Sequence, residues 1–110
     1  MNEVDYTTAE QLQKIFPEFD VGKAPTIIRD RISSVSIESI GTDDHQPYIE
    51  VTVELKDKQK FTVGCWTDFR IAGLAAEIIE DGWDAITKKQ QHKFCDFIAV
   101  AIDVQIGADI

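Results

Sequence analysis

The sequence lacks the features that mark secreted, membrane-spanning or disulfide-linked proteins. Its first eleven residues contain no basic segment followed by an apolar one, so they do not resemble a secretory signal. The longest apolar run covers residues 97–102, whereas a helix needs about 20 apolar residues to cross a bilayer. Only two cysteines occur in 110 residues, too few for a dense disulfide framework. We therefore expect a cytoplasmic protein.

Positive charge is also scarce. The chain has 11 Lys and Arg residues against 20 Asp and Glu residues, which gives a formal net charge of −9. A field of this sign repels the phosphates of nucleic acids and of anionic membranes, so neither is an expected partner. The same field attracts basic surfaces, and strongly basic protein surfaces are mostly those that bind nucleic acid. The charge therefore predicts a basic protein as the partner.

Signatures of catalysis are missing as well. The sequence contains no phosphate-binding glycine loop, no nucleophile elbow and no HExxH zinc motif. One alternative is a small ligand- or metal-binding enzyme-like domain that uses Cys65, His92 and Cys95, but their spacing matches no zinc or cysteine-hydrolase signature. Both cysteines lie within apolar patterns, and cysteine is among the most often buried residues. We expect two inert core thiols, no metal, no cofactor and no enzymatic activity.

Helical signals open the chain. Thr7 and Glu10 have the spacing of a capping box, in which each side chain satisfies a free backbone donor of the first turn. This first helix is expected to end near Phe16, because Pro17 disfavours helical backbone in the residue before it. A short second helix is expected from Ala24, since a proline follows it at the first turn.

The middle of the chain predicts three strands. Apolar and polar residues alternate over residues 34–38, 48–55 and 61–66, which is the period of strands with one buried face. The composition of residues 41–47 is that of a loop.

The apolar faces of the second and third strands also predict how they pair. Facing residues share a face of the sheet, so we place Leu55 opposite Phe61 and Val53 opposite Val63. This register requires a loop with an odd number of residues, which we assign to residues 57–59.

The last third of the chain predicts two helices. Thr67 or Asp68 caps the first of them, and Gly82 ends it, because glycine enters the left-handed conformation without a steric clash. The apolar stripe expected to face the core consists of Ile71, Leu74, Ala75, Ile78 and Ile79.

The final helix is expected to be central to the core. Thr87 and Gln90 form a second capping box, and the helix that follows is apolar nearly all round to about residue 105. We expect Ile78, Phe94 and Ile98 to be interior residues.

These elements predict a single α+β domain over residues 1–110. Its parts are an N-terminal helix, a three-stranded antiparallel meander and two C-terminal helices packed on one face of the sheet. The other face of the sheet is expected to be solvated, or available to a partner.

Two acidic patches are candidate partner-binding sites. The first lies on the outer sheet face and combines carboxylates with aromatic anchors, which are frequent in interface hot spots: Tyr48, Glu50, Glu54 and Trp66. The second surrounds the end of the penultimate helix, where acidic residues oppose the helix dipole and therefore bring no folding benefit: Glu77, Glu80, Asp81 and Asp84. The aromatic anchors favour the sheet face.

In size and charge the chain resembles two groups of small acidic inhibitors. One group is the immunity proteins that neutralise a cognate toxin, and the other is the phage-encoded inhibitors of bacterial defence nucleases. Resemblance to either group implies a non-enzymatic protein that docks on a basic nuclease and covers its site. We expect an immunity protein, with the phage-encoded inhibitor as the alternative.

Overall fold

Two α-helices, three consecutive strands and two further α-helices follow one another along the described part of the chain, in the order that the sequence predicts. The computed structural model describes residues 9–16 and 24–108. Its α+β fold consists of α1 (Ala9–Ile15), α2 (Ala24–Arg31), β1 (Ile32–Asp43), β2 (Gln46–Leu55), β3 (Lys60–Trp66), α3 (Phe69–Asp81), the short 3₁₀ helix η1 (Trp83–Ala85) and α4 (Lys88–Ala108). The second helix and the three-stranded meander are confirmed. The capping box at Thr7 lies outside the described residues.

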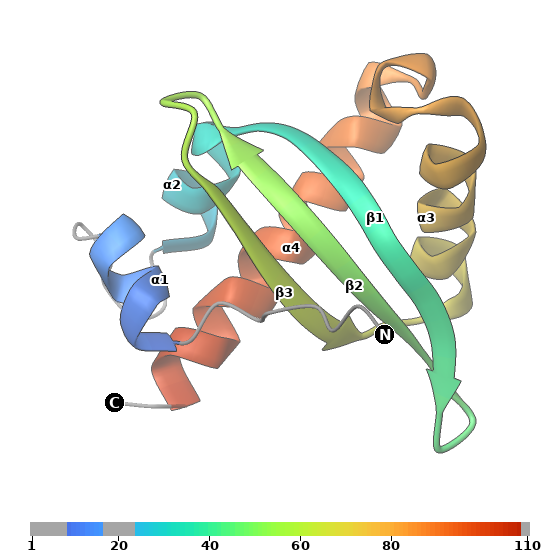
Figure 1. Ribbon diagram of the computed structural model, residues 1–110, viewed down its shortest axis with the longest axis horizontal. Helices are drawn as coiled ribbons and strands as arrows, with labels where there is room; N and C mark the ends of the chain where they lie inside the picture. The colour runs from blue at the N-terminus through green and yellow to red at the C-terminus, as the bar shows by residue number, and fades with distance from the viewer. Residues whose placement is uncertain (1–8, 17–23, 109–110) are drawn as a thin grey trace.

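The sheet is antiparallel, with strand order β1-β2-β3. Figure 1 shows α4 crossing behind the sheet and α3 beside β1. Along β2 every second side chain is buried, from Pro47 to Leu55, and the side chains between them are only half-buried. One face of the sheet is therefore covered by helices, and the other is turned away from them.

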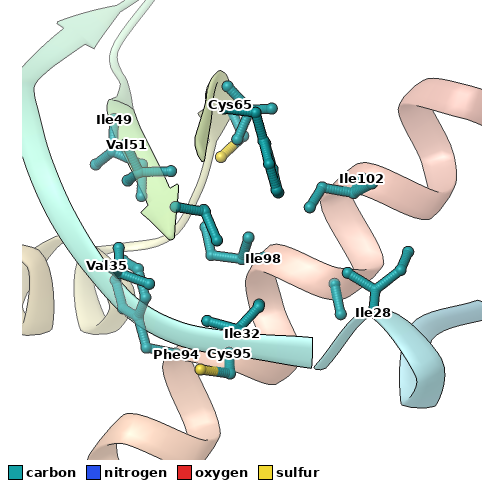
Figure 2. Close-up of a cluster of buried hydrophobic side chains, with 14 of the residues drawn as sticks. Ile28, Ile32, Val35, Ile49, Val51, Cys65, Phe94, Cys95, Ile98 and Ile102 are labelled. Carbon is teal, nitrogen blue, oxygen red and sulfur yellow. The ribbon is translucent and has the colours of Figure 1, made fainter. Parts of the chain in front are cut away.

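The core lies between the inner sheet face and α4. Phe94, Ile98 and Ile102 project from α4 and are fully buried against strand residues such as Val51 (Figure 2). Ile78 of α3 joins the same cluster with 4% of its surface exposed. The expected interior positions Ile78, Phe94 and Ile98 are thus confirmed.

The connection between β1 and β2 is much shorter than the predicted seven-residue loop. The strands pair as far as Asp43 and Gln46, which leaves only Asp44 and His45 in the turn. Both turn residues have positive φ angles, 55° and 69°. A turn of this type matches the twist of the flanking strands. Its residues are polar, as loop residues usually are, so composition alone does not distinguish this tight turn from a longer loop.

The predicted register of β2 and β3 is wrong by two residues. Val53 faces Phe61, and Val51 faces Val63, so each side chain keeps its predicted face but has a different partner. The Leu55 amide donates to the Gln59 carbonyl over 2.8 Å. The loop therefore consists of residues 56–58, in which Lys58 takes a φ of 76° and completes a three-residue hairpin connection.

The caps of α3 follow the sequence, whereas one residue of its apolar stripe does not. Asp68 is the N-cap and accepts from the Ile71 amide over 2.9 Å. Gly82 ends the helix with a φ of 94°, a conformation that favours glycine. Ile79 was expected to face the core, but 56% of its surface is exposed. It lies at the margin of the stripe, one position beyond the buried Ile78.

The capping box of α4 is confirmed in both directions. The Thr87 amide donates to Gln90 Oε1, and the Gln90 amide donates to Thr87 Oγ1. The helix continues through Gly107 to Ala108, slightly further than predicted.

Candidate functional site

The outer sheet face brings the four residues of the first predicted patch together. Tyr48 faces Trp66 across the strands, and their rings meet edge to face with centroids 5.2 Å apart. Glu50 faces Gly64, which offers no side chain to cover it. Glu54 faces Lys60 in the register, although the pair does not come within ion-pair distance. We call this set, Tyr48, Glu50, Glu54 and Trp66, the sheet patch.

Hydroxyl groups donate hydrogen bonds to two carboxylates of this face, Glu38 and Glu54. Thr52 Oγ1 donates to Glu38 Oε1 over 2.8 Å, and Ser34 Oγ donates to Glu54 Oε1 over 3.4 Å. Thr62 Oγ1 lies 3.0 Å from Thr52 Oγ1. Because the single hydroxyl proton of Thr52 is given to Glu38, the Thr62 hydroxyl is the donor of that bond. The acceptor capacity of both carboxylates is only partly used, since an ionised carboxylate has about four lone-pair sites.

The second predicted patch lies at the end of α3 and in η1, and all of its side chains are exposed. We call this set, Glu77, Glu80, Asp81 and Asp84, the helix-end patch. The last turn of α3 contains no basic residue. Glu77 Oε2 accepts from Gln90 Nε2 over 3.3 Å, which ties one member of the patch to α4.

The described ion pairs lie elsewhere. Arg29 binds Asp96 at 3.0 Å, and Arg31 binds Asp57 at 3.1 Å. The Asp96 side chain is the largest contributor to the raised pKa of Arg29. Throughout residues 9–16 and 24–108, no ion pair includes a carboxylate of the sheet patch or of the helix-end patch. Their negative charge is therefore not neutralised within the described part of the molecule.

A groove joins the two patches, and sequence reasoning did not identify it. It has a volume of about 540 Å³ and runs between β1 and the end of α3. Glu54 of the sheet patch and Asp84 of the helix-end patch both line it, with Ile79 and Trp83 as apolar wall residues. The one sequence signal was Ile79 itself, an apolar residue at the margin of its helical stripe.

The alternative site of Cys65, His92 and Cys95 is not assembled. His92 and Cys95 line a polar pocket beside Arg29, whereas Cys65 lines a separate apolar groove beside Phe97. Figure 2 shows Cys65 on β3 and Cys95 on α4, at opposite ends of the labelled cluster. Within the described ranges no three His, Cys, Asp or Glu side chains are grouped to hold a metal ion.

Both thiols are free, buried and of low reactivity. Burial raises the pKa of Cys65 to about 11 and that of Cys95 to about 11, because the apolar surroundings disfavour the charged thiolate. A thiol that stays protonated at neutral pH is a poor nucleophile and a poor metal ligand.

Comparison with known proteins finds no relative of this chain. No protein-family model, no curated protein and no solved structure matches the chain. None of the helices in the described ranges has both the length and the apolar character needed to span a membrane. Function is therefore inferred from the residues themselves.

Proposed function

We propose that the protein is a small acidic binding protein that docks on a basic protein in the cytoplasm and has no enzymatic activity of its own. The partner that fits this charge best is a nuclease-type toxin, which the chain would neutralise as an immunity protein does. A bacterial defence nuclease inhibited by a phage-encoded protein is the alternative. Both partners carry the basic surface with which a nuclease holds phosphates.

The observation that carries the proposal is that the carboxylates of both acidic patches lack ion pairs among the described residues. The sheet patch and the helix-end patch contain six carboxylates, and no described ion pair includes any of them. Like charges held close together oppose folding weakly, so their retention on adjoining surfaces is consistent with a binding role. A basic partner would supply the missing counter-charges.

Charge and aromatic rings would act at different stages of binding. The acidic surface would accelerate encounter, since complementary fields raise association rates at low salt. Tyr48 and Trp66 would hold the complex, because aromatic side chains supply large contact area at little entropic cost. Trp66 is suited to this role, since 55% of its surface is exposed.

The experiment begins by capturing the partner with the tagged protein, identifying it by mass spectrometry and purifying it. We expect one equivalent of the protein to abolish the nuclease activity of the partner, and the association rate to fall steeply with added salt. Glu50→Lys with Glu54→Lys should slow association by at least about tenfold at low salt. Trp66→Ala should mainly raise the dissociation rate.

A matched control separates local from overall charge. Glu10→Lys with Asp30→Lys changes the net charge equally but at exposed residues that already have ion-pair partners. This control should slow association much less. The proposed docking surface would be refuted if both double variants slowed association equally, or if the association rate did not change with salt concentration. Glu77→Lys with Glu80→Lys then measures the share of the helix-end patch.

A further inference from the structure

On the side of β1 that faces away from β2, the backbone amides and carbonyls pair with no other strand of the described sheet. β1 is the longest strand, 12 residues, and β2 is its one strand neighbour in the described sheet. The Lys56 amide donates to the Arg31 carbonyl, so the even-numbered residues of β2 direct their backbone groups toward β1. Their partners include Ser34 and Ser36.

It follows that Val35 and Ile37 direct their backbone groups away from β2. In an antiparallel ladder the residues between the bonded pairs present their amide and carbonyl to the other side. None of the hydrogen bonds among described residues joins a backbone group of Val35 or Ile37 to a partner outside the sheet. Val35 has only 3% of its surface exposed, so the free donor and acceptor that a partner can reach are those of Ile37, which is half-buried.

The groove between β1 and α3 lies along this edge. Its lining includes residues 34–37 of β1 on one side and residues of α3 and η1 on the other. Figure 1 shows α3 beside β1, and η1 follows α3 along the chain. Ile79 and Trp83 make the far wall apolar, whereas Glu54, Ser34 and Ser36 make the outer side polar and acidic.

We infer that this edge accepts an extended segment of the basic partner as a fourth strand. The inference rests on the proposed function, because the charge of the groove selects the occupant. Main-chain hydrogen bonds to Ile37 would provide affinity, and the groove would select alternate side chains.

The two walls of the groove define the segment. Side chains of an added strand alternate between the two faces of the sheet. Those on the helix side would contact Ile79 and Trp83 and should be apolar. Those on the outer side would approach Glu54 and should be Lys or Arg. Among the described residues that line the groove, Lys60 is basic and faces Glu54 across the strands. Asp84 adds a second carboxylate, which keeps the groove net acidic. The segment is therefore an extended run in which apolar and basic residues alternate.

Synthetic peptides test the inference with the full chain. The probe is a short capped peptide of alternating valine and arginine, labelled for fluorescence anisotropy. Two matched peptides carry N-methyl groups on either the valine or the arginine amides, which removes one alternate set of donors and keeps charge and sequence. We expect the parent to bind and one methylated peptide to lose at least about tenfold in affinity, while the other keeps it. For antiparallel addition the sensitive set is the valine amides, because bonded pairs share a face.

Variants of the chain provide the second arm. Ile37→Pro removes the edge donor, and Ile37→Ala is its control, since both lose the isoleucine side chain but only proline loses the amide hydrogen. Peptide binding should fall at least about tenfold further in Ile37→Pro than in Ile37→Ala. Should Ile37→Pro fail to fold by circular dichroism, Ile79→Arg replaces it, with Val104→Arg as the control. Val104 is similarly exposed, at 62%, but lies outside this groove.

The outcomes separate this inference from the proposed function. Equal binding of the parent and both methylated peptides means that charge alone attracts them, which overturns strand addition but leaves acidic docking intact. Absence of peptide binding also overturns strand addition, while the salt-dependent association with the captured partner still tests the docking proposal. A captured partner that associates independently of salt refutes the proposed function itself.

Discussion

The two faces of the sheet differ in what their side chains do for the fold. On the inner face, residues such as Val51, Val53 and Val63 have at most 1% of their surface exposed and meet α4. On the outer face, Glu50 and Glu54 are half-buried between neighbouring strands and have no described ion-pair partner. The inner face therefore stabilises the fold through apolar burial, whereas the carboxylates of the outer face contribute little.

This difference indicates where binding can evolve without loss of stability. A surface carboxylate without an ion-pair partner contributes little to folding, so its position can be selected for another task. A buried methylene contributes about 0.8 kcal/mol, so the inner face is constrained by packing. The predictions below test this contrast from the largest expected effect to the smallest.

Truncation on the inner face should have the largest effect. Phe94 is fully buried and its ring meets Trp83 and Phe97 edge to face. Phe94→Ala should lower the free energy of unfolding by about 3–5 kcal/mol, through lost burial and the cavity left behind. Urea denaturation followed by circular dichroism measures this change. Val104→Ala on the exposed side of the same helix should change it by less than about 0.5 kcal/mol, and similar losses in both variants would contradict a central α4.

Thiol labelling should report the same burial. Burial raises the pKa of both Cys65 and Cys95 to about 11, so very little reactive thiolate is present at pH 8. A thiol reagent should label the native protein orders of magnitude more slowly than the urea-unfolded chain. Fast labelling of either cysteine in the folded protein would show that its side of the core is open. Cys95→Ser should leave partner binding unchanged.

Acidification should expose one contribution of a surface carboxylate to stability. The hydrogen bond from the Ile71 amide is the largest cause that lowers the pKa of Asp68. A pKa lowered by folding stabilises the native state above the unfolded value, about 4 for Asp, and this stabilisation is lost as the pH falls through the folded value. Asp68→Asn should therefore be less stable than the parent at pH 7, and the two should converge once the pH falls below the pKa of Asp68 in the folded protein. A pH-independent difference between them would rule out the carboxylate charge as its source.

The smallest effect is expected on the outer face. Glu50→Gln with Glu54→Gln should change the free energy of unfolding by no more than about 0.5 kcal/mol, and toward higher stability, because like-charge repulsion is relieved. Thermal and urea denaturation in low salt measure the change. A loss comparable to that of Phe94→Ala would mean that these carboxylates are part of the stabilising structure.

Local sequence signals account for most of the fold. The capping box of Thr87 and Gln90, the N-cap Asp68 and the stop at Gly82 each act within one helical turn, so the sequence identifies them directly. Period-two alternation likewise identifies which side chains share a sheet face. The register of β2 and β3 could not be predicted in this way, because a shift of two residues leaves every side chain on the same face of the sheet.

For the candidate site, too, the sequence predicted what local patterns determine and missed what depends on tertiary packing. The sequence grouped Tyr48 with Trp66 correctly, since their strand positions place them on one face. It missed the groove, because the groove depends on how far α3 lies from β1, a tertiary distance that no local pattern encodes. Ile79 was assigned to the core for the same reason: the helical period gives a direction but does not say where the neighbouring strand ends.

The open edge of β1 also bears on how copies of this protein coexist at high concentration. Unpaired strand edges are templates for stacking one molecule on another, and natural proteins commonly protect them with charge. Here the formal charge of −9 makes any two copies repel each other at neutral pH. Near the isoelectric point, about 4.5, that protection vanishes while the edge remains. The acid excess would thus act as a colloidal stabiliser, and mild acid is where filaments or precipitates should first form.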